Sequence, residues 1–352
     1  MNKYFLMFLF LIGVSGCSDT SMDTNGRDDA EWLIPTGQVF DGGPGKDGIP
    51  SIDNPIFIRV NEVPPYLFDD DLVVGVRIGN EIRAYPHPIL DWHEIVNDEI
   101  GGEAFSVTYC PLTGSAITWD RVLSGTKTTF GVSGLLYNSN LIAYDRATDS
   151  YWSQMMMQAV RGQHISEKAE LVTMIETTWG TWKRMYPGSK VLSTETGFSR
   201  QYGAYPYGDY RVSNRLIFPV VNNDDRLHRK ERVHGTTFGD ETRIFQINEF
   251  PDTIHTINDA YRDYPLVTVG SNAFNFAVAY ERRLDDGTLL RFTPVQNQLP
   301  IVMKDSEGTY WDVFGFAVDG PRTGAQLKQP ESYIAFWFAW AAFFPGAAIH
   351  TP

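Results

Sequence analysis

Short runs of alternating hydrophobic and polar residues dominate this chain, and turn-forming residues separate them at close intervals. Residues 72–78 form a valine-rich apolar run and residues 81–85 alternate, with Gly79-Asn80 between them. Such spacing is typical of two antiparallel strands joined by a tight turn. The same pattern predicts five further strands, at residues 104–109, 116–121, 128–132, 140–145 and 151–156.

Helical spacing occurs in only a few short stretches. Leu90, His93 or Glu94, and Asn97 stand three and four residues apart, which predicts a short helix over residues 89–97 between two strands. Residues 178–186 predict a second helix, which ends at the stop signal Pro187-Gly188. A more apolar helix is predicted over residues 333–344. Short helices among antiparallel strands indicate the α+β class.

The pattern of the first part of the chain returns in the second part. The segment GNEIRAY at residues 79–85 matches GDETRIF at 239–245, and AITWDR at 116–121 matches AVAYER at 277–282. Trp182 and the Pro-Gly stop after it match Trp340 and its own Pro-Gly stop. Because the matches keep their order about 160 residues apart, we interpret them as an internal duplication.

These observations predict an α+β fold of two tandem copies of a β-rich unit, each with antiparallel meander strands and two short helices. The first unit includes a Gly-Pro-Asp-rich segment at its start, where turn chemistry excludes regular helix. The predicted organisation is a signal peptide at 1–16, a lipidated cysteine with a polar tether at 17–40, the first unit at 41–193, a connecting segment at 194–232 and the second unit at 233–352.

The chain begins with features of an exported, lipid-anchored protein. Lys3 precedes an apolar run over residues 5–14, which fits a secretory signal and is too short to span a bilayer. Small residues lead to Cys17, as in bacterial lipoprotein signals, although an ordinary signal peptide with a chance cysteine is the alternative. Ser18 favours the outer over the inner membrane. We therefore expect a cell-envelope protein that contacts the membrane through a lipid on Cys17.

Charge and composition narrow the classes of partner. The formal net charge is −14, and 43% of the residues are hydrophobic, enough to build a full core. The acidity argues against nucleic acid and against electrostatic adhesion to anionic lipid. We interpret it as a determinant of solubility.

The chain has two cysteines, Cys17 and Cys110. If Cys17 carries lipid, Cys110 has no intramolecular partner, although the compartment permits disulfides. A lone thiol there is either buried and inert, or kept for reactivity or metal binding.

The duplication separates shared features from those present in one copy. His93 and Glu94 stand in the first copy where the second has Ile254 and His255, and Cys110 falls opposite Gly270. The motif TGFSRQYG at residues 196–203 has no counterpart after the second copy. We therefore expect the functional site in the first copy.

Five separated motifs carry a family resemblance: DGGPGKDGIPSIDNP, ILDWHEIVND, VTYCPLTGSAITWDR, FGVSGLLYNSNLIAYDRATDSYWSQ and TGFSRQYG. Together they resemble the bacterial and archaeal family of domain of unknown function 3179, from about Asp41 to the C-terminus. The resemblance implies a secreted or lipid-anchored globular protein and no particular activity. Many relatives carry Cys-Pro-Leu-Cys where this chain has Cys110-Pro-Leu-Thr113, which argues against a dithiol or two-cysteine metal role here.

One interpretation is a thiol- or metal-dependent envelope enzyme. Cys110 would be the nucleophile and His93 its base, with Glu94 as a polarising group. The same Cys110 and His93 would hold copper or zinc, which cysteine and histidine suit. The run Met155-Met156-Met157 is equally explained by core packing.

The other interpretation is a binding or scaffold lipoprotein without catalysis. A pocket between the copies would take a small anionic or carbohydrate-like ligand, whose identity the sequence leaves open. The candidate ligand-binding residues are Lys46, Asp47, Arg146, Arg200 and Tyr202. Each of these charges is alternatively a solvated group or part of an ion pair that fastens a loop.

Overall fold

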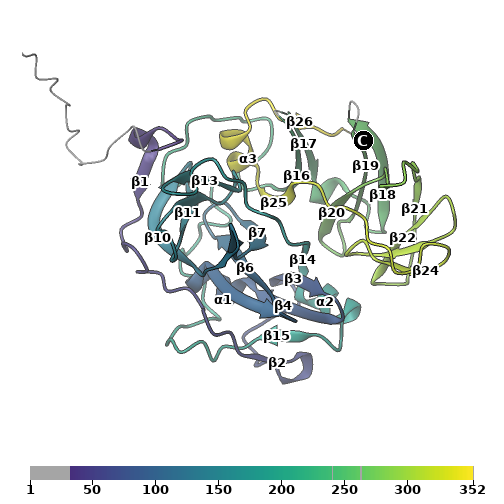
Figure 1. Ribbon diagram of the computed structural model, residues 1–352, viewed down its shortest axis with the longest axis horizontal. Helices are drawn as coiled ribbons and strands as arrows, with labels where there is room; N and C mark the ends of the chain where they lie inside the picture. The colour runs from purple at the N-terminus through teal and green to yellow at the C-terminus, as the bar shows by residue number, and fades with distance from the viewer. Residues whose placement is uncertain (1–31, 240, 262–263, 352) are drawn as a thin grey trace, which may run out of the picture.

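The computed structural model describes residues 32–239, 241–261 and 264–351 (Figure 1). The predicted signal peptide and Cys17 lie outside the described residues. Trp32, placed in the tether by the predicted boundaries, forms a β-bridge with Arg161 of the folded body. None of the helices in the described part of the chain is long and apolar enough to cross a bilayer.

The described part of the first half contains three larger sheets and a two-stranded ribbon, in which neighbouring strands are antiparallel except for the parallel pair β4 and β15. One sheet has the order β14-β3-β4-β15-β2, the second β5-β6-β7 and the third β1-β10-β11-β12-β13. The bounds are β1 (Val39–Asp41), β2 (Phe57–Arg59), β3 (Leu72–Ile78), β4 (Glu81–Pro86), β5 (Ile95–Ile100), β6 (Glu103–Cys110), β7 (Ser115–Asp120), β8 (Val122–Leu123), β9 (Thr126–Lys127), β10 (Phe130–Tyr137), β11 (Asn140–Asp145), β12 (Tyr151–Ser153), β13 (Gln158–Arg161), β14 (Met174–Thr178) and β15 (Lys190–Leu192).

The second half has the corresponding sheets in the same order. These are β25-β16-β17-β26, β18-β19-β20 and β21-β22-β23-β24, so that its first and third sheets have one strand fewer (Figure 1). The bounds are β16 (Arg232–Phe238), β17 (Glu241–Gln246), β18 (His255–Tyr261), β19 (Tyr264–Ser271), β20 (Phe276–Glu281), β21 (Phe292–Pro294), β22 (Ile301–Asp305), β23 (Tyr310–Asp312), β24 (Ala317–Asp319), β25 (Ser332–Phe336) and β26 (Ala348–Ile349).

The α+β class predicted from the sequence is wrong, because the protein is mostly β. Strands hold 43% of the residues and helices 9%. The described chain has three α-helices, α1 (His87–His93), α2 (Trp179–Met185) and α3 (Trp337–Phe343), and three 3-10 turns, η2 (Thr36–Gln38), η3 (Val60–Glu62) and η4 (Ile247–Glu249). Among its described residues, the second half therefore lacks the second helix that the prediction gave to each unit.

The helix predicted over residues 89–97 is in fact a helix followed by a strand. α1 ends at His93, and Glu94 takes the left-handed conformation with φ of 57°. β5 begins at the next residue, so Asn97 lies in a strand. Its side-chain amide donates to Phe130 O at 2.8 Å, and its Oδ1 accepts from Phe130 N at 2.9 Å. Asn97, which the prediction placed in the helix, therefore joins β5 to β10 of a neighbouring sheet.

Matching side-chain contacts occur in both halves. Asn258 and Phe292 form the same pair of hydrogen bonds, each of 2.7 Å, that Asn97 and Phe130 form. Trp152 donates to Asp145 and Trp311 to Asp305, at 3.2 and 2.9 Å. These contacts support the correspondence between the sheets of the two halves.

Strand register corrects one expected match. Cys110 pairs with Ser115 directly before the segment AITWDR, and Ser271 pairs with Phe276 directly before AVAYER. The counterpart of Cys110 is therefore Ser271, one residue beyond the Gly270 expected from the sequence. Alignment by residue type alone missed the single-residue shift that backbone pairing fixes.

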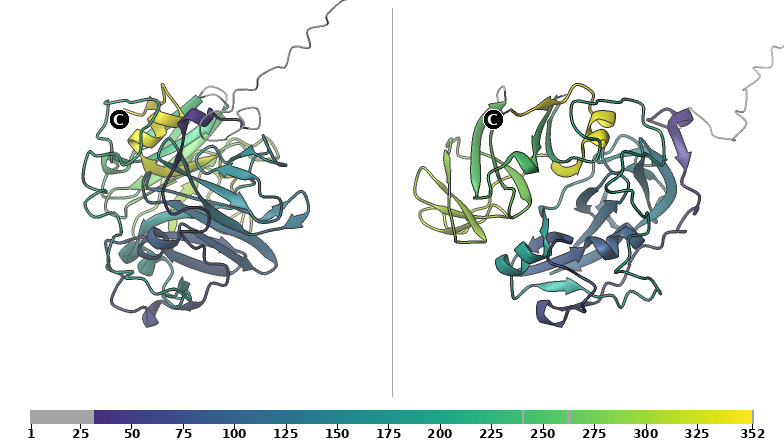
Figure 2. Two further views of the ribbon diagram at one scale, coloured as in Figure 1. Left: turned by 90° about the vertical axis from the view of Figure 1, so that its left-hand side faces the viewer. Right: turned by 180° about the vertical axis from the view of Figure 1, so that it is seen from behind.

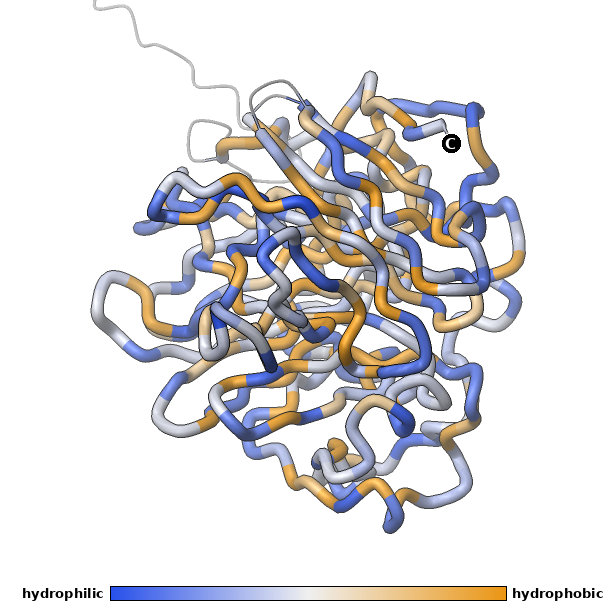
Figure 3. Tube along the Cα trace, turned by 90° about the vertical axis from the view of Figure 1, so that its right-hand side faces the viewer, coloured by the Kyte–Doolittle hydropathy of each residue, from blue (hydrophilic) through white to orange (hydrophobic). Residues whose placement is uncertain are grey.

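The core lies between the halves as well as within them. Trp152 of the first half and Trp340 of the second belong to one buried cluster, and Trp182 and Trp311 belong to another. Hydrogen bonds also join the halves: Phe336 N donates to Thr113 O at 2.8 Å, and the Thr177 hydroxyl donates to Phe274 O at 2.6 Å. The right-hand view of Figure 2 shows the two halves side by side. Figure 3 shows hydrophobic and hydrophilic residues interspersed along the whole Cα trace.

Candidate functional site

His93 lies at the end of α1 and is fully buried. Its Nδ1 is 2.8 Å from Pro50 O and its Nε2 is 2.8 Å from the hydroxyl of Tyr202. Because a carbonyl only accepts, Nδ1 carries the hydrogen and Nε2 accepts from Tyr202. Burial lowers the pKa of His93, which favours this neutral ring. Both nitrogens thus fasten neighbouring segments to α1.

Cys110 lies at the end of β6 and is 1% exposed. Its thiol lies 3.6 Å from Ser139 O, and no hydrogen bond joins it to His93 among the described residues. Burial, and to a smaller extent the charge of the Glu94 carboxyl, raises the pKa of Cys110 to about 11. The thiol is therefore protonated at neutral pH, which disfavours nucleophilic attack.

Glu94 is buried, and its side chain reaches a small cavity of about 60 Å³. Its Oε1 lies 3.5 Å from the hydroxyl of Tyr207, which belongs to the connecting segment. Burial raises the pKa of Glu94 to about 8, so the carboxyl holds its proton at neutral pH. Leu112, Leu141 and Phe218 are among the apolar walls of this cavity.

An ion pair that the sequence did not reveal lies beside this group, with the Asp91 carboxylate buried and the Arg211 side chain 35% exposed. Arg211 of the connecting segment contacts both carboxylate oxygens of Asp91 at 2.7 Å and stacks on Tyr205 at 4.0 Å. Burial raises the pKa of Asp91 to about 7 even though Arg211 opposes the shift. Arg211 stands more than a hundred residues from Asp91 in a segment without regular structure, so no local pattern announces the pair.

The five predicted ligand-binding residues lie in two places. Lys46, Asp47 and Arg146 meet near the Gly-rich segment, where Arg146 contacts Asp47 at 2.9 Å and Lys46 pairs with Asp149. They contact one another and their neighbours, which fastens the segment to β10 and β11. Arg200 is exposed above the Trp92 ring, and Tyr202 is held by His93.

The described residues contain no group of three or more His, Cys, Asp or Glu side chains arranged to hold a metal ion. Met155 and Met157 are buried in the core, and only Met156 of that run is partly exposed. The arrangement of the methionines therefore matches core packing.

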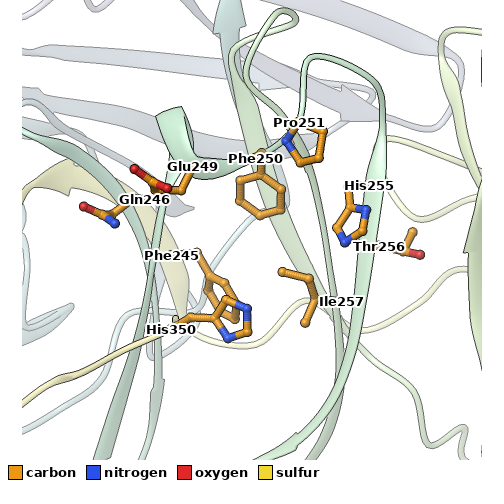
Figure 4. A pocket seen from close by; sticks show the side chains of 9 residues that line it. All are labelled: Phe245, Gln246, Glu249, Phe250, Pro251, His255, Thr256, Ile257 and His350. Atoms are coloured by element: carbon orange, nitrogen blue, oxygen red, sulfur yellow. The ribbon is translucent and has the colours of Figure 1, made fainter. Parts of the chain in front are cut away.

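A pocket of about 460 Å³ lies in the second half, where the sequence predicted no site (Figure 4). Phe245, Phe250, Ile257 and His350 converge on it from β17, the turn after η4, β18 and the end of β26. The His350 ring lies on Phe245, with centroids 4.9 Å apart. The other lining residues are Gln246, Glu249, Pro251, His255 and Thr256.

The polar edge of this pocket has a defined donor. Arg243 lies 3.0 Å from His350 Nδ1, and since a guanidinium only donates, Nδ1 is the acceptor. The neutral His350 ring then carries its hydrogen on Nε2. Burial and Arg243 lower the pKa of His350, which favours that neutral form. The pocket thus combines apolar walls with a few polar groups, the His350 N–H among them, as small ligand sites do.

Comparison with known proteins identifies the family and goes no further. No curated protein and no solved structure gave a significant match to this chain. The sequence model of the family described as protein of unknown function DUF3179 matches residues 46–347, and the chain therefore belongs to that family.

Proposed function

We propose that the protein is an exported binding protein of the cell envelope, anchored by a lipid on Cys17, whose ligand site is the pocket between β17, β18 and β26. The apolar leader, the small residues before Cys17 and the polar stretch after it support the anchor. The net charge of −14 makes nucleic acid an unsuitable ligand.

The pocket is the observation that carries this proposal. Its volume of about 460 Å³ falls in the range of ligand-binding clefts, and its walls include Phe245 and Phe250. By contrast, Cys110 is 1% exposed, and the cavity that Glu94 lines holds about 60 Å³. The walls favour a ligand with an aromatic or large aliphatic group, and His350 Nε2–H favours an acceptor beside it.

An apolar dye tests the pocket. We expect 1-anilinonaphthalene-8-sulfonate to bind the folded protein at one saturable site detected by fluorescence. Ile257→Trp, which fills the pocket from β18, removes that site. Val212→Trp adds the same indole at a side chain that is 81% exposed and leaves binding unchanged. Equal dye binding by wild type and Ile257→Trp would refute the proposed ligand site.

Phase partitioning tests the anchor independently. We expect the full-length protein, expressed with its leader in a lipoprotein-processing bacterium, to enter the detergent phase of Triton X-114 and to incorporate labelled palmitate. Cys17→Ala is expected to move the protein to the aqueous phase and to abolish labelling. A wild-type protein found in the aqueous phase would exclude the lipid anchor.

A second candidate function places chemistry at Cys110 with His93, as a thiol- or metal-dependent envelope enzyme. The observation that favours it is the buried acid Glu94 beside Cys110. The backbone of Glu94 has a positive φ, which is an unusual conformation for glutamate. Metal analysis of protein purified from its envelope, together with thiol titration, decides between the candidates. Stoichiometric copper or zinc, or a Cys110 thiol that reacts rapidly at pH 7 without unfolding, would favour the enzyme.

A further inference from the structure

In the first half, a segment of the chain itself fills the place that corresponds to the second-half pocket. There a cover segment, residues 50–59, runs from the edge of β5 to the edge of β15. Ile52 N donates to Ile95 O at 2.9 Å, and Asn97 N donates to Ile52 O at 2.8 Å. β2 then pairs antiparallel with β15, and Phe57 sets its ring edge-on against Tyr85 at 5.7 Å.

Strand register shows that the two places correspond. Tyr85 follows the β4 residue that pairs with Gly75, and Phe245 follows the β17 residue that pairs with Gly235. A Cβ added at either glycine would collide with a helical tryptophan, Trp182 of α2 at Gly75 and Trp340 of α3 at Gly235. This shared contact confirms that the two glycines correspond. Tyr85 beneath Phe57 thus has the same place as Phe245 beneath the pocket.

The neighbouring strands match in the same way. β15 pairs in parallel with β4, and β26 pairs in parallel with β17. Leu192 and His350 are the residues that directly follow these two paired segments. Ile95 and Val96 precede Asn97 as Thr256 and Ile257 precede Asn258. The pocket is therefore bounded by the second-half equivalents of the surfaces that the cover segment occupies.

The second half has no cover segment among the described residues. β26 is the last strand of its sheet and β18 is the last of its own, with the pocket between them. Leu192 is 1% exposed and Val96 fully buried, whereas His350 and Ile257 are partly exposed. Free strand edges beside an apolar cavity are the geometry that binds an added strand.

We propose that the second half binds an extended polypeptide segment of another protein, added as a strand antiparallel to β26, with an aromatic side chain in the pocket against Phe245. This inference rests on the proposed function, because it names the ligand class of the same site. The aromatic residue takes the place that Phe57 has in the first half. Backbone hydrogen bonds to β26 supply the pairing, and the pocket supplies the selectivity.

Segments of this chain are less suitable occupants. The polar stretch at residues 18–31 has Met22 as its large apolar residue and no aromatic one, so it cannot fill a pocket lined by phenylalanine. The cover segment of a second copy is already paired with its own β15. A segment from a different protein, with an aromatic residue between strand-forming neighbours, meets both requirements.

The cover segment supplies the probe. We expect the synthetic peptide SIDNPIFIR, residues 51–59 with blocked ends, to bind the full folded chain with one-to-one stoichiometry by isothermal titration calorimetry. Replacing the phenylalanine of the peptide by alanine is expected to weaken binding roughly 30-fold or more, because it empties the pocket. Ile257→Trp in the protein removes binding, and Val212→Trp leaves it unchanged.

Backbone methylation separates strand addition from simple insertion of a side chain. Ser193 N donates to Ile56 O at 2.7 Å, so the pair two residues along, Val191 and Ile58, is again hydrogen-bonded in an antiparallel ladder. N-methylation at Ile58 of the peptide therefore removes a bond to the strand and is expected to weaken binding about tenfold. N-methylation at Phe57 blocks an outward N–H and serves as the matched control.

The outcomes distinguish this inference from the proposed function. Dye binding that Ile257→Trp abolishes, with no binding of the peptide, overturns the strand inference and leaves a small-molecule site. Equal effects of the two N-methylations overturn strand addition, because insertion of the ring alone would then explain binding. Absence of both dye and peptide binding overturns the proposed function as well.

Discussion

The two halves of this protein share their strand order and differ in what covers them. In the first half, α1, the cover segment and the connecting segment close over the sheets and bury Asp91, His93, Glu94 and Cys110. In the second half, a 3-10 turn stands in place of α1, and the corresponding surface remains an aromatic pocket. The same arrangement of strands therefore encloses buried polar residues in the first half and leaves an open apolar pocket in the second.

The difference shows that candidate chemistry and accessible space need not lie together. Sequence comparison of the copies directed attention to the half that kept its polar residues. Those residues mainly contact the covering segments, as His93 contacts Pro50 and Tyr202. The half with fewer unusual residues has the larger opening, because segments that would fill it are missing from its described part.

The largest expected effect comes from removing the partner of the buried Asp91 carboxylate in the first half. Arg211→Met leaves the Asp91 carboxylate buried without its partner, and we expect the free energy of unfolding at pH 8 to fall by about 3–5 kcal/mol. Urea denaturation followed by fluorescence measures the change. Asp252, which precedes Asn258 as Asp91 precedes Asn97, is exposed, so Asp252→Asn serves as the control with little effect. A loss below 1 kcal/mol for Arg211→Met would show that the pair does not hold the connecting segment.

The next effect is a pH dependence specific to the first half. Burial raises the pKa of Glu94 from 4.5 to about 8, so the folded state holds a proton that the unfolded state releases. This contribution to stability is complete below pH 4.5 and is lost as the pH rises to about 8. We expect wild type to lose on the order of 3 kcal/mol more than Glu94→Gln over this interval.

Chemical denaturation at closely spaced pH values tests this expectation. His255, the exposed residue at the corresponding place in the second half, provides the variant His255→Gln as a control. Parallel stability curves for wild type and Glu94→Gln would mean that the Glu94 carboxyl is hydrated and the first half is less tightly closed than described.

A paired substitution tests the shared framework directly. A Cβ at Gly75 would lie 2.0 Å from the ring of Trp182, and one at Gly235 would lie 2.4 Å from Trp340. We expect Gly75→Ala and Gly235→Ala each to lower the melting temperature, with losses of about 1–3 kcal/mol. Calorimetry of both variants measures the pair. If only one substitution destabilises the protein, the two helices do not pack on their sheets in equivalent ways.

The smallest effect concerns the partly exposed charges that fasten the Gly-rich segment. Arg146 contacts Asp47 and Asp53 at 2.9 and 3.3 Å, and its side chain is 29% exposed. Because water and salt screen such pairs, Arg146→Met is expected to cost about 0.5–1 kcal/mol and less at 1 M salt. A larger, salt-independent loss would assign Arg146 a packing role.

The sequence by itself determined the local elements and the repeat pattern. The hairpin at residues 72–85 and the helix ending near Pro187 follow from alternation, turn residues and stop signals, which are local properties. The family also follows from sequence, because its motifs extend over most of the chain. The helix predicted over residues 89–97 extends too far because Asn97 lies in a strand and bonds to Phe130, more than thirty residues away.

Only the tertiary structure decided which polar residues are sealed and where an opening remains. Arg211 reaches Asp91 across more than a hundred residues, and Pro50 reaches His93 across more than forty. The pocket exists because the described residues of the second half include no equivalent of the cover segment, and such a difference in packing leaves no local pattern in the sequence. Burial and cavities are properties of how distant segments pack, which is why periodicity and spacing could not reveal them.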